Sequence, residues 1–124
     1  TIQLNSSFTL PTGTVMKNRL FKSAMSEQLG DKQHNPTKGL ANLYQRWAQG
    51  GLGLSMSGNI MIDRQALGEP KNVVLDDDSN LALFRQWTTA GTENGTHLWA
   101  QLNHPGKQIP NFISKEPVGV RIVN

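Results

Sequence analysis

The chain has 124 residues, with 12 Lys and Arg against 9 Asp and Glu, no Cys, and 36% hydrophobic residues. Without cysteine there is no disulfide framework, thiolate metal site or cysteine nucleophile, and apolar runs of only a few residues exclude a membrane span. The net charge of +3 is spread along the chain and does not indicate nucleic-acid binding. No secretory signal pattern is present at the N-terminus, so we expect a cytoplasmic protein.

A β-hairpin is predicted over residues 8–16, where two short extended segments flank Pro11 and Gly13. Proline fixes φ near the value that a turn requires and glycine accepts a positive φ, so the pair favours a tight reversal. Residues 19–26 are short, partly apolar and without a helical stripe. We interpret them as the first strand of the main sheet.

The first helix is predicted from its caps and from its apolar stripe. Asn35 and Pro36 fit the N-cap and the first helical position, and Gly50 with Gly51 fits a C-terminal stop. Between these caps, apolar side chains recur at helical spacing, at Leu40, Leu43, Tyr44 and Trp47. Residues 52–62 are nearly continuous, uncharged and rich in glycine, which indicates a strand buried on both faces, as in a parallel sheet.

A second helix and a third strand are predicted next. Residues 76–80 offer N-cap side chains and negative charge for a helix N-terminus, and Gly91 or Gly95 ends the apolar face that follows. Residues 96–103 alternate apolar with polar or aromatic side chains, as a strand does. Residues 104–124 have no clear period and are expected to form a loop-like tail.

Strands separated by helix-length segments indicate an α/β fold with a parallel sheet. The βα units are expected over residues 19–50 and 52–95, within one partial domain over residues 1–124. Ligands of such folds collect at the C-terminal ends of the strands. Here these ends carry small or hydrogen-bonding residues and no charge, at 23–26, 56–59 and 101–104. The pattern suits a polar planar ligand, although loops also begin with small polar residues at strand ends.

Lys17-Asn18-Arg19 leads into residues 23–27, a glycine-rich run covers residues 50–59, and Gln101-Leu102 lies within residues 100–107. In this order and at this spacing, the three motifs resemble the first three barrel strands of the old yellow enzyme family. These are FMN-dependent NAD(P)H oxidoreductases, or ene-reductases, built on a TIM barrel. The resemblance implies the N-terminal part of a (β/α)8 barrel, about three βα units preceded by a hairpin.

The resemblance also implies where a flavin would lie. The residues that it places along the ring or at its edge are Ser23, Ala24, Met25, Ser26, Gly58 and Gln101. Ser26 stands where family members have Thr or Cys near the flavin C4 carbonyl and N5, and Gly58 takes a small position beside the ring. Gln101 would hydrogen-bond the pyrimidine edge, and an amide inside an apolar strand requires a partner in any case. Gln28 stands where some relatives have a substrate-contacting Tyr.

The chemical step is expected to need residues beyond these. In the family, a His paired with His or Asn, a proton-donating Tyr and the loops that hold the FMN phosphate come later in the chain. No catalytic residue is therefore expected in this segment, whose one tyrosine, Tyr44, falls on the first predicted helix. His104 precedes Pro-Gly and is interpreted as shaping a loop. No spacing of His, Asp or Glu suggests a metal site.

The expected function is that of an N-terminal segment of an FMN-dependent NAD(P)H oxidoreductase. It would act on an activated alkene or a quinone-like small molecule by hydride transfer through flavin N5. The alternative is a truncated, non-catalytic barrel fragment that does not bind FMN stably alone. Three parallel strands cannot close a barrel, so the third strand is expected to leave an unpaired edge. The expected partner is the remaining barrel segment or a second copy, and neither nucleic acid nor a membrane is expected.

Overall fold

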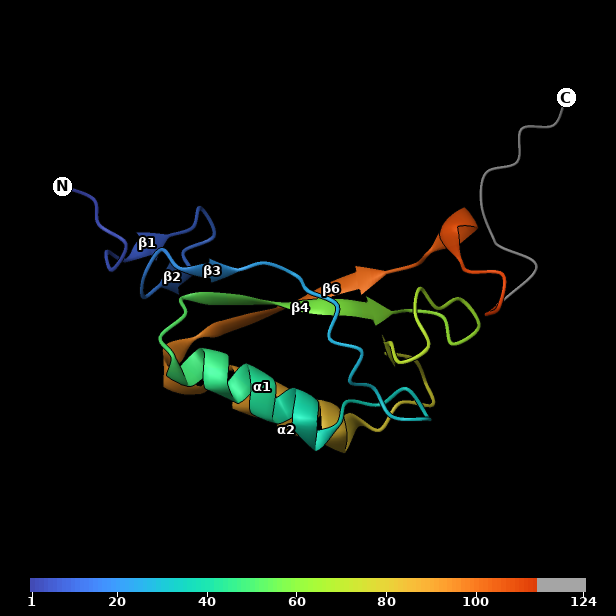
Figure 1. The fold of residues 1–124 in the computed structure, drawn as a ribbon. Coiled ribbons are helices and arrows are strands. Elements are labelled where there is room, and N and C mark those ends of the chain that lie inside the picture. The colour runs from blue at the N-terminus through green and yellow to red at the C-terminus, as the bar shows by residue number, and fades with distance from the viewer. Residues whose placement is uncertain (114–124) are drawn as a thin grey trace, which may run out of the picture.

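A computed structural model describes residues 1–113, which form a parallel sheet covered on one face by two helices (Figure 1). Residues 114–124, part of the predicted tail, lie outside the described residues. The elements in chain order are β1 Phe8–Thr9, β2 Val15–Met16, β3 Phe21–Lys22, α1 Lys38–Gln49, β4 Leu54–Met61, β5 Val73–Val74, α2 Leu81–Gly91 and β6 His97–Asn103. Short 3-10 turns cover Glu93–Gly95 and Gly106–Gln108.

The predicted hairpin is present as the antiparallel pair β1 and β2, in which Phe8 lies opposite Met16. Gly13 adopts a φ of 90° in the connection, a value that favours glycine. The hairpin lies at the amino-terminal end of the sheet (Figure 1). There Phe8 and Met16 line a shared hollow with Phe21 and Leu54.

Strand β4 is the centre of the main sheet, and its neighbours β3, β5 and β6 all run parallel to it. Because β6 pairs along the whole length of β4, β3 and β5 must share the other side of that strand. The prediction of a first strand over residues 19–26 is wrong in extent, since only Phe21–Lys22 pair with β4. The chain then leaves the ladder, and β5, which the sequence analysis missed, occupies that side at the end of β4.

The two helices begin at capping side chains. In α2 the cap is Asn80, which lies within the predicted residues 76–80. Its side chain accepts the N–H of Ala82 at 3.1 Å. In α1 the cap is Thr37 rather than the predicted Asn35. The side chain of Asn35 is buried and instead accepts the N–H of Asn80 at 2.8 Å, which ties the start of one helix to the start of the other.

The hydrophobic core lies between the helices and the sheet. It consists of Leu40, Tyr44, Ile60, Val73 and Trp87. Tyr44 packs edge-on against Trp87 at a ring separation of 5.4 Å, a favoured arrangement for aromatic pairs. The opposite face of the sheet has a smaller cluster at the end of β4, formed by Met61, Leu67 and Val74.

Within residues 1–113, no helix lies over the rest of this opposite face, which we call the open face (Figure 1). Side chains alternate along a strand, and Leu98 packs on the helix side, so Trp99 and Gln101 belong to the open face. Phe21 and Trp99 are 54% and 40% exposed. Among the residues described, no helix has the length and apolar character needed to cross a membrane.

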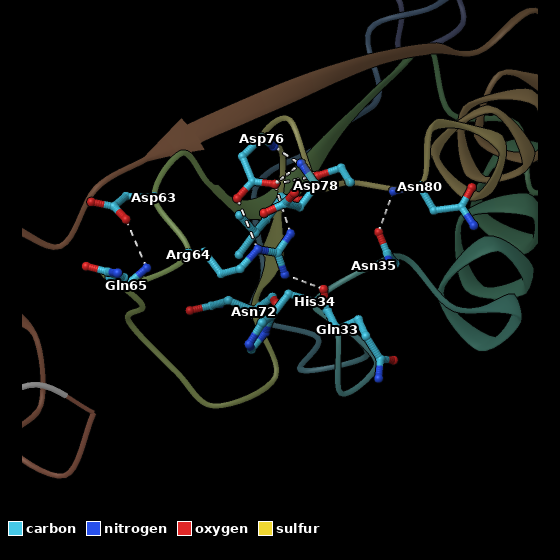
Figure 2. A network of polar contacts seen from close by, with 12 residues as sticks. Gln33, His34, Asn35, Asp63, Arg64, Gln65, Asn72, Asp76, Asp78 and Asn80 are labelled. Carbon is cyan, nitrogen blue, oxygen red and sulfur yellow. Dashed lines mark hydrogen bonds and ion pairs between the residues drawn. The ribbon is translucent and has the colours of Figure 1, made fainter.

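A polar clasp joins the loops beyond the sheet (Figure 2). The Arg64 guanidinium donates to both carboxylate oxygens of Asp76, at 2.9 and 3.1 Å, and to the carbonyl of Gln33. Two parallel bonds between a guanidinium and a carboxylate fix geometry as well as charge. The clasp therefore holds the loop after β4, the loop before α1 and the start of α2 together.

Acid should weaken this clasp. The hydrogen bond from Arg64 holds the pKa of the Asp76 carboxyl below its usual range. A carboxyl whose pKa is depressed by folding adds stability above its unfolded pKa, and this stability is lost as the pH falls through the folded value. We expect Asp76→Asn to lower the urea midpoint at pH 6 and to have a much smaller effect at pH 3.

Asp77→Asn is the matched control, because its side chain makes no hydrogen bond or ion pair to the described residues. It should leave the midpoint nearly unchanged at both pH values. An equal loss for Asp76→Asn at pH 6 and pH 3 would show that its charge is irrelevant.

Candidate functional site

Because the strands are parallel, the segment after β3 continues along β4 toward the carboxyl-terminal edge of the sheet, although β3 itself ends beside Ser55, near the start of β4. Asn59 lies opposite Gln101 in the register of β4 and β6. On the other side, the segment after β3 runs past Gly58. Of the predicted residues, Met25, Gly58 and Gln101 are therefore brought close to one another toward this edge.

Gly58 is the point of closest approach between the segment after β3 and β4. A Cβ at this position would lie 2.3 Å from the Met25 carbonyl oxygen and 2.2 Å from the Glu27 carboxylate. Distances this short are not tolerated between heavy atoms, and the Met25 oxygen belongs to the backbone. Gly58 was predicted to be small because it would lie beside a flavin. The structure gives another reason, because the backbone of Met25 leaves no room for a side chain at this position.

A β-bulge in β4 lies at the same point. The register with β6 shifts between Met56 and Asn59, which leaves an extra residue in β4. Ser57 lies within the bulge and is 1% exposed. Its hydroxyl accepts the N–H of Gln101 at 2.9 Å and donates to the carbonyl of Gly58 at 2.8 Å. This role of Ser57 was not predicted, although a serine in an otherwise buried strand is a signal for it.

Gln101 and Ser26 lie at the edge in environments that sequence alone did not show. Gln101 is exposed in the described structure, so burial does not by itself require a partner for its amide, and its role toward a flavin stays a prediction. The Ser26 hydroxyl donates to the Glu69 carboxylate. A ligand that takes a hydrogen bond from Ser26 would have to compete with Glu69.

Beneath the edge, Tyr44 and Glu27 form a polar contact that the sequence analysis also missed. Tyr44 is fully buried, and its hydroxyl accepts the N–H of Gly58 at 3.0 Å and donates to Glu27. Burial, with the Glu27 carboxylate as a further cause, raises the pKa of Tyr44 far above its usual value. The phenol is therefore a neutral donor and is not available as an acid for a ligand. Burial also lowers the pKa of Lys22, which lies over the Tyr44 ring.

Gln28, the predicted substrate contact, is exposed and has a φ of 51°. It lines a cavity of about 20 Å³ with Glu27, Asn72 and Trp87 among others. A cavity of that size holds one water molecule, so a flavin would have to lie on the open face instead. No group of three metal-ligating side chains is present among residues 1–113.

His104 contributes to a turn, as interpreted from the sequence. Its Nδ1 accepts the N–H of Gly106 at 3.0 Å, which closes the first turn after β6. Its Nε2 lies 3.8 Å from the Asp63 carboxylate in the loop after β4.

The chain is similar to proteins of known name. The NADH-dependent flavin oxidoreductase iliE of Hypocrea jecorina is 38% identical over 106 residues, which cover 82% of this chain and 26% of that protein. The oxidoreductase iccE of Talaromyces variabilis is 33% identical over 113 residues, covering 88% and 27%. The old yellow enzyme homologue of Zymomonas mobilis superposes with a TM-score of 0.80 at 24% identity, covering 92% and 32%. The chain matches an N-terminal portion of NADH-dependent flavin oxidoreductases in sequence and of old yellow enzymes in fold.

The resemblance seen in the motifs is thereby confirmed at the level of the family and the fold. Morphinone reductase in complex with tetrahydroNAD also superposes, with a TM-score of 0.81 at 18% identity, over 94% of this chain and 32% of that protein. No protein-family model matches the sequence. The chain spans about a quarter of the length of the curated relatives and a third of the old yellow enzyme structures, and residues 1–113 form an α/β sheet without a closed barrel.

Gly58→Ala should destabilise the chain. The added methyl group collides with the Met25 carbonyl, and overpacking of this kind costs about 1–3 kcal/mol. Gly39→Ala is the matched control, because its Cβ would meet only the Thr37 hydroxyl at 3.7 Å. It should be neutral or stabilise helix α1 by up to about 1 kcal/mol. Urea unfolding of both variants measures the difference, and equal midpoints would contradict the close approach at Gly58.

Proposed function

We propose that this chain forms the ring-facing part of the flavin site of an FMN-dependent NAD(P)H oxidoreductase. The observation that carries the proposal is the meeting of uncharged residues from the segment after β3, from the bulge of β4 and from β6, beside the open face of the sheet. The curated relatives are named NADH-dependent flavin oxidoreductases, which supports a flavin as the planar ligand.

The donors at the edge fit the pyrimidine side of an isoalloxazine ring. That side presents both acceptors and a donor, and the exposed Gln101 amide can donate and accept. Exposed backbone at residues 23–26 can supply further N–H and C=O groups, since most of this segment is free of ladder bonds. No charged side chain from Ser23, Ala24, Met25, Ser26, Gly58 or Gln101 opposes a neutral ring.

In this proposal the residues of the chain bind and orient the ring. FMN, when bound, supplies hydride transfer from NAD(P)H to an activated alkene or quinone-like substrate through N5. Ser26 would tune the ring once its hydroxyl turns away from Glu69. Gln28 would lie at the mouth of the site, on the substrate side.

The residues described do not supply the proton for such a reaction. Tyr44 is the one tyrosine of the chain. Its hydroxyl is fully buried and bonded to Glu27 and Gly58. We therefore assign no catalytic residue to this segment.

Flavin binding is tested by titrating the purified chain with FMN and following flavin absorbance and fluorescence. If the chain binds FMN, Gln101→Ala should weaken binding by about two- to tenfold, the value of one net hydrogen bond. Gln86→Ala, at an exposed position of helix α2, is the control and should have no effect. Unchanged affinity for Gln101→Ala would refute its role, and an absence of binding to the wild-type chain would favour the alternative of a fragment that needs partner segments.

The partner proposed for this chain is the remaining barrel segment or a second copy. Among the described strands β6 pairs only with β4, which leaves seven residues of edge, and Leu102 on it is 60% exposed. An unpaired edge of this length is a template for association. Light scattering coupled to size exclusion should show self-association that increases with concentration, and a compact stable monomer would contradict it.

A further inference from the structure

The hydroxyl of Tyr44 connects the segment after β3 with the bulge of β4, two of the places to which the flavin ring is assigned. It accepts the N–H of Gly58 at 3.0 Å and donates to the carboxylate of Glu27. Glu27 follows β3, Gly58 lies in the bulge of β4, and Tyr44 reaches both from helix α1. A hydroxyl has one proton, and here the Glu27 carboxylate is the nearer acceptor, while the Met56 carbonyl lies at 3.4 Å.

The bulge explains why such a contact is needed. Gly58 is buried, and a buried N–H without an acceptor costs free energy. Because the register with β6 shifts around Gly58, backbone N–H groups there are accepted by side-chain oxygens instead of strand carbonyls. The Tyr44 oxygen accepts the N–H of Gly58, and the Ser57 oxygen accepts that of Gln101.

Packing alone does not require a tyrosine at this position. The ring of Tyr44 lies edge-on to Trp47 at 5.0 Å and to Trp87 at 5.4 Å, contacts that a phenylalanine would keep. Lys22 lies over the same ring at 4.9 Å. Replacing Tyr44 with phenylalanine would therefore remove the hydrogen bonds of the hydroxyl and keep the packing of the ring in the core.

We propose that Tyr44 is a positioning residue of the flavin site. Through Glu27 and Gly58 it sets the spacing between the Met25 carbonyl and the bulge, and so the shape of the surface on which the ring would lie. The proposal rests on the proposed function for the identity of the ligand. The positioning itself can be measured without any ligand.

The test compares Tyr44→Phe with the wild-type full chain by amide hydrogen exchange and ¹H–¹⁵N spectra. Loss of one net hydrogen bond should speed exchange of the Gly58 amide by about two- to tenfold. Chemical-shift changes should concentrate at Met25 and Ser26, and the FMN affinity should fall by a similar factor. Gln45→Ala, the next residue of α1, is the control: it loses a bond to Glu93 at 2.7 Å and should leave these amides unchanged.

Substitutions at Glu27 provide a conservative rescue. Glu27→Gln keeps an oxygen that accepts from the Tyr44 hydroxyl, so Gly58 exchange and FMN affinity should stay near the wild-type values. Glu27→Ala removes that acceptor and should reproduce the shift changes at Met25 and Ser26. This pair decides the question even if Tyr44→Phe does not fold.

Two results would overturn the proposal. One is Gly58 exchange in Tyr44→Phe equal to that in Gln45→Ala. The other is a Glu27→Gln variant as perturbed as Glu27→Ala, which would indicate a role for charge instead of hydrogen bonding. If the wild-type chain binds no FMN, the proposed function fails. The exchange data still decide whether Tyr44 positions Glu27 and Gly58.

Discussion

The arrangement at the carboxyl edge of the sheet depends on one close approach, that of the Met25 carbonyl to the α-carbon of Gly58. Any side chain at position 58 would meet that oxygen at 2.3 Å. Because the Met25 oxygen belongs to the backbone, it could make room for a side chain only if the chain itself shifted. The segment after β3 can therefore leave the hydrogen-bonded ladder after Lys22 and still lie against β4.

This backbone contact is supported by polar groups buried between the helices and the sheet. Lys22 lies 4.4 Å from the Trp47 ring and 4.9 Å from the Tyr44 ring, so two aromatic faces partly offset the loss of water around its ammonium group. Glu27 opposes the lowering of the Lys22 pKa that burial causes. The aromatic rings and the Glu27 carboxylate therefore offset only part of the cost of burying Lys22, whose Nζ has no hydrogen-bond partner among the described residues.

Features set by neighbouring residues were predictable from the sequence. Asn80 caps α2, and Gly13 allows the hairpin, because a cap and a turn involve only a few adjacent residues. The start of α1 was misplaced because the Asn35 side chain bonds to Asn80, 45 residues away. The contact of Tyr44 with Glu27 was missed for the same reason: helical periodicity predicts that a tyrosine is buried and says nothing about which loop lies over its hydroxyl.

The two faces of the sheet explain the modest apolar content of 36%, because only one of them is covered by a hydrophobic core with helices. The helix side has a complete core, whereas on the open face Phe21 and Trp99 remain 54% and 40% exposed. Exposed apolar groups next to an unpaired edge favour association, and the same face is the surface proposed for a flat ligand. A ring bound there would cover part of the apolar surface that a partner strand would otherwise cover. If a partner covers Trp99 when it pairs with β6, ligand binding and association compete, because both remove that side chain from water.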